Sequence, residues 1–290
     1  MYLFVVNEVS GKGRGREVWA YVQKRLQEMR VPHEAVCTEG PGHAEEIARD
    51  AREGKMFKAI IAVGGDGTVN EVGNGVIGSD LPIGYIPAGT GNDFALAHRI
   101  PLDPEWALER ILRHQVYQVD TGMLKERHMI GFMGIGFDAK VAEAVNMSQR
   151  KRWLGRLTYG IEAIKTLKSF KPQPAVITVD GRRYEYDGVW LVAVANIPNY
   201  AGGIRICPHA QMNDGLLDLC CVRNLTPGQF LRVFPSAYRG KHIHHPSVVF
   251  HSGREITIET DAPFIAHVDG EVHGGAPVTV RVAPKSLSIL

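Results

Sequence analysis

The sequence predicts a doubly wound α/β domain of the Rossmann-like type followed by a β-rich, sandwich-like domain. Over residues 1–122, short apolar segments alternate with amphipathic helical segments, whereas closely spaced strand patterns dominate residues 123–290. Alternating strands and helices are typical of a parallel sheet, and closely spaced strands separated by turn residues are typical of a β-sandwich or open barrel. We therefore expect a nucleotide-binding domain at 1–122 and a second domain at 123–290.

Four apolar segments are the expected strands of the first domain. The run at 58–63 is continuously apolar, as in a parallel strand that is covered on both faces. The segments between the strands repeat apolar residues at helical spacing. The expected strands are 2–6, 33–37, 58–63 and 82–89, and the expected helices are 16–30, 43–54 and 104–114.

The second domain is expected to be mostly strands. Its clearest helical stretch is 153–170, and a second helix is expected at 226–240. Asp180-Gly181 lies between two strand patterns and predicts a hairpin turn. The sequence leaves open whether the last strand returns to the first domain.

Charge and composition exclude several classes of protein. The net charge of +2 argues against a dedicated nucleic-acid binder. No apolar run approaches the roughly 20 residues of a membrane span, and no basic region precedes the first apolar run, as a signal peptide requires. The cysteines show no metal-binding or disulfide spacing, which favours a reducing, cytoplasmic location. They are Cys37, Cys207, Cys220 and Cys221.

Glycine-rich turns follow the first, third and fourth strands, at 10–15, 64–68 and 87–95. The carboxyl ends of parallel strands meet at one edge of a sheet, where α/β folds bind ligands. Glycines there let the backbone approach phosphate closely. A flexible loop at 10–15 and a tight turn with a solvated aspartate at 64–68 are the alternatives.

Side chains in these turns suit a nucleotide. Asp66 is expected to orient a metal ion, Thr68 to cap the following helix, and Lys12 to add positive charge. The candidate nucleotide-binding residues are Asn7, Ser10, Gly11, Lys12, Gly64, Gly65, Asp66, Gly67, Thr68, Thr90, Gly91 and Asn92.

The motifs GGDGTVNEV (64–72), PAGTGNDFA (87–95) and NEVSGKG (7–13) resemble the diacylglycerol kinase catalytic domain family. PHAQMNDGLLDL (208–219) and VDGE (268–271) are similar to later motifs of that family, so the resemblance spans nearly the whole chain. It implies ATP as co-substrate, Mg²⁺ as cofactor, and a lipid acceptor that meets ATP between the two domains. The family includes bacterial diacylglycerol kinases and the sphingosine and ceramide kinases.

The resemblance also implies individual roles. Glu271 would be the general base, partly buried beside the lipid, and Asp66 would organise Mg²⁺-ATP. Asp214 and the carbonyl oxygen of Leu216 would hold a second, structural Mg²⁺. Two departures from the family pattern bear on this: Asn213 stands where an aspartate is commoner, and Glu8 stands where the family has proline.

The expected activity is phosphorylation of diacylglycerol to phosphatidic acid by a cytoplasmic lipid kinase that contacts the inner face of the membrane transiently. An NAD kinase, which shares a GGDGT-type turn, and a non-catalytic nucleotide- or lipid-binding regulator are the alternatives. The lipid acceptor and the oligomeric state, including a homodimer, stay open. The basic run 150–156 suits either a membrane interface or a solvated helix start, whereas 242–245 (HIHH) is expected to be a surface loop.

Overall fold

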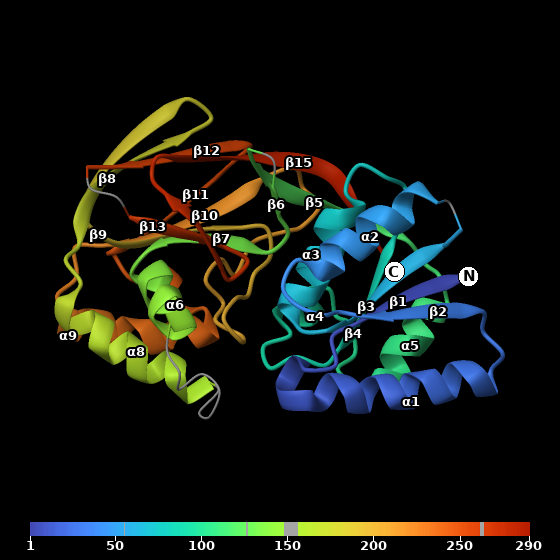
Figure 1. The fold of residues 1–290 in the computed structure, drawn as a ribbon. Helices are drawn as coiled ribbons and strands as arrows, with labels where there is room; N and C mark the ends of the chain where they lie inside the picture. Colours follow the sequence, from blue (N-terminus) through green and yellow to red (C-terminus); the bar gives the residue numbers. More distant parts are fainter. Residues whose placement is uncertain (55, 126, 148–155, 262–263) are drawn as a thin grey trace. The chain divides into compact units, whose positions relative to one another are not determined.

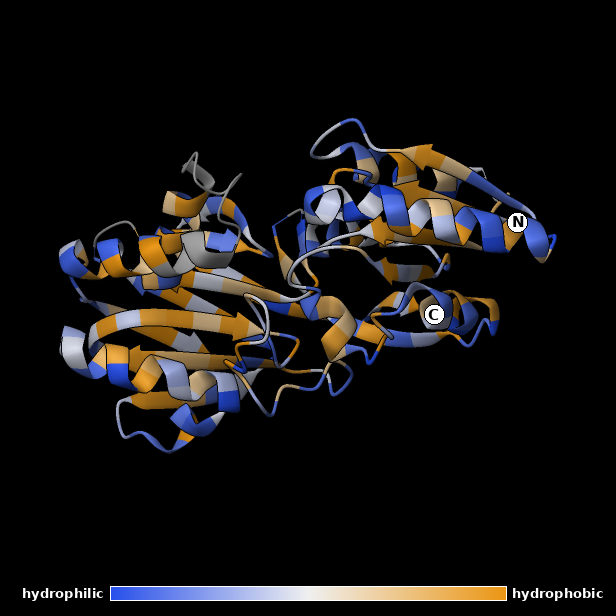
Figure 2. Ribbon diagram, turned by 90° about the horizontal axis from the view of Figure 1, so that it is seen from below, coloured by the Kyte–Doolittle hydropathy of each residue, from blue (hydrophilic) through white to orange (hydrophobic). Residues whose placement is uncertain are grey.

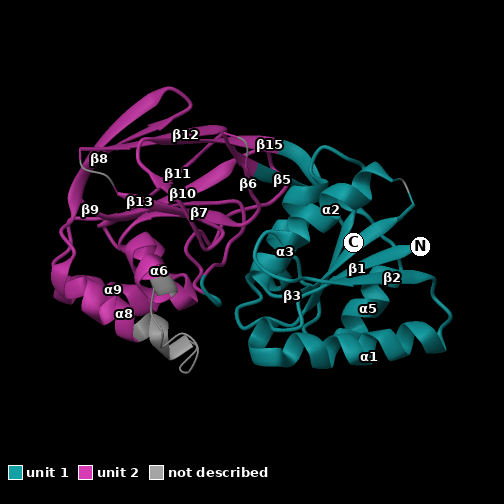
Figure 3. Ribbon diagram, in the orientation of Figure 1, with its two compact units in different colours: residues 1–121, 201–203, 284–290 teal, residues 122–200, 204–283 magenta. Residues whose placement is uncertain are grey.

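The computed structural model describes residues 1–54, 56–125, 127–147, 156–261 and 264–290. The chain divides into two compact units, shown in Figure 3. Unit 1 comprises residues 1–121, 201–203 and 284–290, and unit 2 comprises 122–200 and 204–283. An α/β unit is thus followed by a β-rich one, and the predicted fold class is confirmed.

Unit 1 is built on a parallel sheet in which the strand order is β4-β3-β1-β2, with Ile289 at the end of β15 pairing with Ile83 of β4. All six residues of β3 are buried, as expected for a central parallel strand. Figure 1 shows α1 and α5 on one face of this sheet and α2 and α3 on the other. The strands are β1 (Tyr2–Val6), β2 (His33–Cys37), β3 (Ala59–Gly64) and β4 (Ile83–Pro87). Strand β5 (Tyr117–Leu124) pairs with β6 and β15, and its last three residues belong to unit 2.

The helices of unit 1 begin directly after the strands or after short turns. Figure 2 shows that they alternate hydrophilic and hydrophobic residues, whereas the strands are mostly hydrophobic. They are η1 (Ser10–Gly13, a 3₁₀ turn), α1 (Arg14–Glu28), α2 (His43–Glu53), α3 (Asp66–Val76), α4 (Asp93–Ala97) and α5 (Pro104–Leu112).

Unit 2 is built on antiparallel strands in the order β14-β13-β7-β9-β8-β12-β15, and β10 pairs with both β9 and β11. The predicted hairpin joins β8 to β9 through Asp180 and Gly181, whose φ angles are 48° and 80°. The strands are β6 (Arg127–Met129), β7 (Phe132–Gly136), β8 (Gln173–Val179), β9 (Arg182–Ala195), β10 (Leu217–Arg223), β11 (Val248–Gly253), β12 (Glu255–Thr260), β13 (Ile265–Val268), β14 (Glu271–Gly275) and β15 (Val278–Ile289).

The helices of unit 2 pack onto this sheet through a cluster of aromatic rings. Trp190 of β9 stacks on Phe230 of α9 at 4.7 Å between ring centroids and on Phe170 at 5.5 Å. Phe137, the first residue of α6, contacts all three rings. The helices are α6 (Phe137–Met147), α8 (Arg156–Ser169), α9 (Pro227–Val233) and the 3₁₀ turns η2 (Phe234–Arg239) and η3 (Lys241–His244).

Three sequence expectations in this unit were wrong. Helix α6 is not expected from the sequence, because a glycine-rich segment precedes it. In the structure, its residues Phe137, Val141 and Val145 are buried at helical spacing. The helix expected at 226–240 is α-helical only to Val233; Pro235 has no N–H to continue the ladder, and a 3₁₀ turn follows. Within 242–245, His242 is buried, with Nε2 2.9 Å from the Ile206 carbonyl oxygen.

The basic run 150–156 lies outside the described residues, apart from the backbone of Arg156 at the start of α8.

Candidate functional site

The carboxyl ends of β1, β3 and β4 meet at one edge of unit 1, and their three turns are joined by hydrogen bonds. The N–H of Asn7 donates to the Val63 carbonyl at 2.9 Å, and the N–H of Ala88 donates to the Gly64 carbonyl at 2.7 Å. The side chain of Asn7 donates to Thr68 Oγ1 at 3.1 Å. The glycine turns that the sequence singles out therefore form one continuous structure.

Several of the turn glycines are needed because the turns pack on one another. A Cβ on Gly89 would lie 2.6 Å from the Gly65 Cα, and one on Gly11, where φ is +59°, would collide with the Ala88 carbonyl oxygen. Gly67 differs from these. A Cβ there would meet no heavy atom within 4 Å, and Gly67 is exposed. No contact in the described structure therefore requires a glycine at position 67, and close approach of a ligand there stays a prediction.

Asp66 is the first residue of α3, and its carboxylate holds the turn that follows β4. One oxygen accepts the N–H of Asn92 at 2.7 Å and the other accepts the N–H of Phe94 at 3.0 Å. Burial raises the pKa of Asp66 to about 6, and the negative charge of Asp93 adds to this rise while the amide bonds oppose it. Asp66 thus joins two of the predicted turns.

Asn92 uses its side chain inside its own turn. Its Oδ1 accepts hydrogen bonds from the Tyr85 hydroxyl and from the N–H of Gly89, both at 3.1 Å. Its backbone lies in the left-handed region, with φ 57°, which asparagine tolerates well. The contacts of Asn92 in the structure are therefore those of a turn-forming residue, and binding of ATP by Asn92 stays a prediction.

Asp93 is a further candidate site residue, which the sequence reasoning did not select. Its two oxygens accept the N–H groups of Gly202 and Gly203 at 2.7 and 2.8 Å, which explains why residues 201–203 belong to unit 1. Asp93 and Asp66 also lie close together: a Cβ on Gly91 would be 2.9 Å from an oxygen of Asp66 and 3.3 Å from one of Asp93. The available signal was the acid directly after Asn92 in the motif.

Thr68 does not cap α3, contrary to expectation. The helix begins two residues earlier, at Asp66, because Gly65 takes the extended conformation of an N-cap. Thr68 is buried in the first turn, where its hydroxyl accepts the Asn7 side chain. Lys12 and Thr90 are exposed at the same edge of the sheet.

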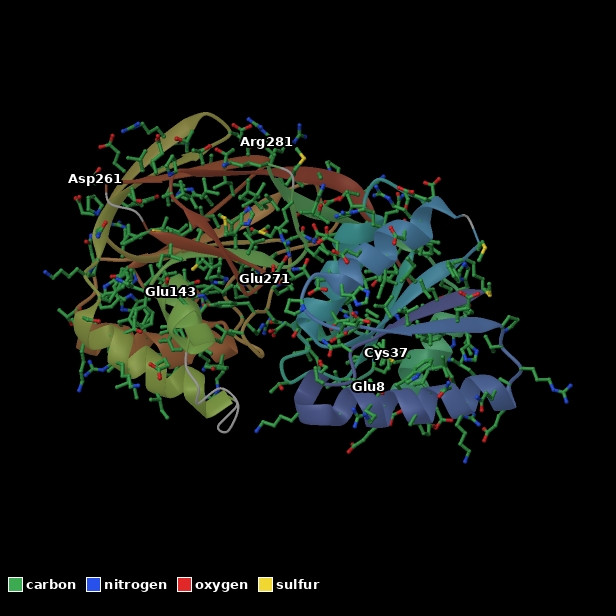
Figure 4. All side chains as sticks on the ribbon, in the orientation of Figure 1. Glu8, Cys37, Glu143, Asp261, Glu271 and Arg281 are labelled. Atoms are coloured by element: carbon green, nitrogen blue, oxygen red, sulfur yellow. The ribbon has the colours of Figure 1, made fainter. Side chains whose placement is uncertain are left out.

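Glu8, the departure from the family pattern, lies two residues after the end of β1 and is labelled in Figure 4. Its carboxylate is 3.5 Å from the guanidinium of Arg16. The negative charge that Glu8 brings to this edge is thus accompanied by a positive one.

Glu271 is the first residue of β14 in unit 2 (Figure 4). Its side chain is 51% exposed, and its carboxylate lies 2.8 Å from the Arg127 guanidinium. Further burial beside the lipid stays a prediction. The preceding turn is fixed by Asp269, whose carboxylate accepts the N–H groups of Ile130, Gly131 and Phe132 at 2.8–2.9 Å. Burial raises the pKa of Asp269, and these amide bonds oppose the rise.

Asp214, the candidate second metal ligand, is exposed and accepts the N–H of Leu216 at 3.0 Å. Asp218 nearby in the chain accepts the Ser252 hydroxyl, and burial raises its pKa. In the part of the chain that the structure describes, no three or more His, Cys, Asp or Glu side chains are grouped as a metal centre would require. A structural Mg²⁺ at Asp214 and Leu216 stays a prediction.

Two known protein families match the chain. The diacylglycerol kinase catalytic domain matches residues 1–124, and the YegS C-terminal NAD kinase beta sandwich-like domain matches residues 131–290. The chain therefore belongs to the diacylglycerol kinase family, and it is a lipid kinase, that is, a phosphotransferase.

Individual relatives agree with this assignment. A Bacillus subtilis (strain 168) protein named "Putative lipid kinase YtlR" is 30% identical over 304 residues, covering 99% of this chain and 98% of that protein. A Mycobacterium tuberculosis (strain ATCC 25618 / H37Rv) protein named diacylglycerol kinase is 30% identical over 259 residues, covering 87% and 82%. The crystal structure of a diacylglycerol kinase from Bacillus anthracis str. Sterne superposes with a TM-score of 0.76 at 22% identity, covering 99% and 95%, which supports the fold.

Among the described residues, no helix has both the length and the apolar character needed to cross a membrane.

Proposed function

We propose that the protein transfers the γ-phosphate of ATP to the free hydroxyl group of diacylglycerol, giving phosphatidic acid. ATP follows from membership of a kinase family. Diacylglycerol is supported by the names of relatives that match most of the chain. The observation that carries the proposal is the joining of the family's glycine turns at one edge of unit 1, through Asp66 and its bonds to Asn92 and Phe94.

The N-terminus of α3 suits the phosphates of ATP. The N-cap residue Gly65 has no side chain to cap this helix, and N–H groups in the first turn of a helix have no partner within the helix itself. Helix N-termini attract anions through these groups and through the helix dipole. The open space over Gly67 gives phosphate access, and the exposed Lys12 supplies charge from the neighbouring turn.

The carboxylates of Asp66 and Asp93 fit Mg²⁺ when it arrives with the nucleotide. Their oxygens bound the space beside Gly91, where a side chain would fill it. Hard carboxylate oxygens suit Mg²⁺, which commonly takes one or two carboxylates and completes its shell with water and substrate phosphates. The pair therefore does not need a third protein ligand. Bound Mg²⁺ would neutralise charge on the phosphates.

Glu271 would accept the proton of the lipid hydroxyl during transfer. Phosphoryl transfer depends mainly on positioning and charge neutralisation, and a carboxylate suffices to orient the attacking hydroxyl. The Asp269 turn and the Arg127 ion pair hold Glu271 at the start of β14. We assign the base to this residue on that basis.

An acceptor panel tests the proposed function. The full-length protein is incubated with Mg²⁺ and γ-labelled ATP, and with detergent-dispersed diacylglycerol, a sphingoid base, ceramide or NAD as separate acceptors. Preferential labelling of diacylglycerol is expected. Preferential labelling of a sphingoid base or ceramide would move the protein to another lipid kinase class, and labelling of NAD would contradict the lipid assignment.

The acceptor also determines where the enzyme works. Diacylglycerol resides in bilayers, so a kinase acting on it must meet the membrane surface. We propose that this contact is transient and at the cytoplasmic face. A homodimer stays a prediction.

A further inference from the structure

The distribution of charge within unit 2 is uneven. From Leu219 to Arg254 the chain has no aspartate or glutamate, although the whole sequence has 31. The same segment carries five lysines and arginines: Arg223, Arg232, Arg239, Lys241 and Arg254. Three of these cations lie on α9, η2 and η3, which follow one another from Pro227 to His244 with a left-handed turn at Gly240 before η3.

One side of this helical segment is fixed to the core. Phe230 is 3% exposed and stacks on Trp190, and Phe234 stacks on Phe230 at 5.8 Å. Ala237 is also buried and accepts the N–H of Arg205 through its carbonyl. The capping box of Thr226 and Gln229 fixes the start of α9. The segment therefore presents a defined outer side.

That outer side combines apolar and basic residues. Leu231 and Tyr238 are each 52% exposed, seven residues apart, and each is followed directly by an exposed arginine. Lys241 follows two residues after the second arginine and is also exposed. We call this the α9–η3 face: Leu231, Arg232, Tyr238, Arg239 and Lys241.

The cations of the α9–η3 face have no acidic partner in the part of unit 2 that the structure describes. Among the residues that the structure describes, Arg232, Arg239 and Lys241 form no ion pair with a carboxylate. Single exposed apolar residues need no explanation. A leucine and a tyrosine among cations that have no paired acid, however, match a surface that offers both acyl chains and anionic headgroups. Tyrosine and arginine favour the boundary between lipid headgroups and acyl chains.

We propose that the α9–η3 face docks on the surface of an anionic lipid bilayer. Leu231 and Tyr238 enter the headgroup region, and the three cations contact phospholipid phosphates. The assignment of this face goes beyond the proposed function. It rests on the proposed function in one respect, namely that a lipid substrate makes a membrane the expected partner. Nucleic acid is the less suitable occupant, because the net charge of the chain is only +2 and leucine offers no stacking surface for a base.

Vesicle sedimentation tests the proposal without reference to catalysis. The protein is mixed with vesicles of one of two compositions. One is phosphatidylcholine alone, and the other is phosphatidylcholine with about 30% of the anionic lipid phosphatidylglycerol. Binding only to the anionic vesicles, weakened by salt, is expected. The triple variant Arg232→Gln, Arg239→Gln, Lys241→Gln should bind on the order of a hundredfold more weakly, since each cation near an anionic surface contributes about fivefold.

A matched triple variant in unit 1 is the control. Lys24→Gln, Arg30→Gln and Arg113→Gln remove the same charge from exposed positions and should leave vesicle binding within about twofold of wild type. Equal loss in both variants would mean that net charge, not this face, governs binding, and would overturn the proposal. So would failure of the wild-type protein to bind anionic vesicles.

The apolar pair and the activity give two further readouts. Leu231→Ser with Tyr238→Ser should weaken vesicle binding about tenfold or more and leave sedimentation of the protein alone unchanged. Dissociation of a dimer in this variant would show instead that the face joins two copies. Both variants should keep wild-type turnover with detergent-dispersed diacylglycerol, whereas absence of turnover in the wild type would contradict only the proposed function.

Discussion

Asp66 and Asp93 each accept hydrogen bonds from two backbone N–H groups, so each carboxylate fixes a neighbouring segment of chain. The motif shows that acids occur among glycines and predicts a phosphate site. It does not show which amides the acids bind, because Gly202 and Gly203 lie more than a hundred residues after Asp93. The types of residue in the site were thus predictable, and their long-range partners were not.

His98 makes the stability of unit 1 sensitive to acid. The residue is buried beside Phe94 and Tyr117, and burial lowers its pKa from 6.5 to about 3, with the positive charge of Arg110 adding to the effect. The unfolded chain therefore binds a proton below pH 6.5 that the folded chain does not. Stability is full above pH 6.5 and falls as the pH drops from 6.5 towards 3. When the pH is lowered from 7.5 to 5, His98 should reduce the free energy of unfolding by about 2 kcal/mol.

Urea unfolding of wild type and His98→Gln at the two pH values measures this contribution. The variant should lose about 2 kcal/mol less than wild type on acidification. His114→Gln, at an exposed position of the same unit, should lose as much as wild type. An identical pH dependence in wild type and His98→Gln would show that the buried histidine does not carry the effect.

Arg127 is expected to affect turnover by holding the Glu271 carboxylate in place, and to contribute little to the folding stability of the protein. An ion pair with a half-exposed partner contributes only about 0–1 kcal/mol to folding. Loss of its contact would leave the Glu271 carboxylate free to turn away from the reacting hydroxyl, and misplacement of a catalytic group is costly. We expect Arg127→Gln to lower kcat about tenfold with the KM for ATP unchanged.

The matched control is Arg281→Gln, which breaks another arginine–glutamate pair in unit 2, that of Arg281 with Glu255. It should leave kcat within about twofold of wild type. Steady-state kinetics of the two variants, with partial recovery in Arg127→Lys, would support a positioning role. Equal rates in wild type and Arg127→Gln would rule it out.

At the scale of the elements, the passage from β3 to α3 separates two uses of glycine. Gly64 and Gly89 make room for other parts of the protein, whereas Gly67 faces open space in the first turn of α3. Gly67→Ala should raise stability by up to about 1 kcal/mol through helix propensity and raise the KM for ATP severalfold. Gly228→Ala, at an equally open position in the first turn of α9, should leave the KM unchanged. An unchanged KM in Gly67→Ala would place the phosphates elsewhere.

The elements themselves were largely predictable in unit 1, where each apolar run is followed by a turn and an amphipathic helix. The start of α3 was placed two residues late, because Thr68 is a good capping residue and Gly65 gives no side-chain signal. In unit 2, α6 was missed because glycines precede it, and Pro235 ended α9 earlier than the apolar spacing indicated. Local spacing predicts an element well only where its boundary residues are themselves distinctive.

At the scale of the whole molecule, unit 1 includes two segments that come from late in the sequence, 201–203 and 284–290. The sequence leaves open whether the last strand returns to the first domain; in the structure, Ile289 pairs with Ile83 of β4. The sequence does not predict that residues 201–203 belong to unit 1. Three residues carry no periodic pattern, and they are held through the N–H groups of Gly202 and Gly203, which donate to the Asp93 carboxylate. The chain therefore passes between the units at four points, after residues 121, 200, 203 and 283.

The most direct test of the central claim is single-turnover transfer of labelled γ-phosphate from Mg²⁺-ATP to detergent-dispersed diacylglycerol by wild type, Glu271→Gln and Glu259→Gln. Glu259 is an exposed glutamate of β12 and serves as the matched control. We expect labelled phosphatidic acid from wild type and Glu259→Gln, and a loss of at least about a hundredfold in Glu271→Gln with ATP binding retained. Transfer at the wild-type rate by Glu271→Gln, or no labelled lipid from the wild-type protein, would contradict the account.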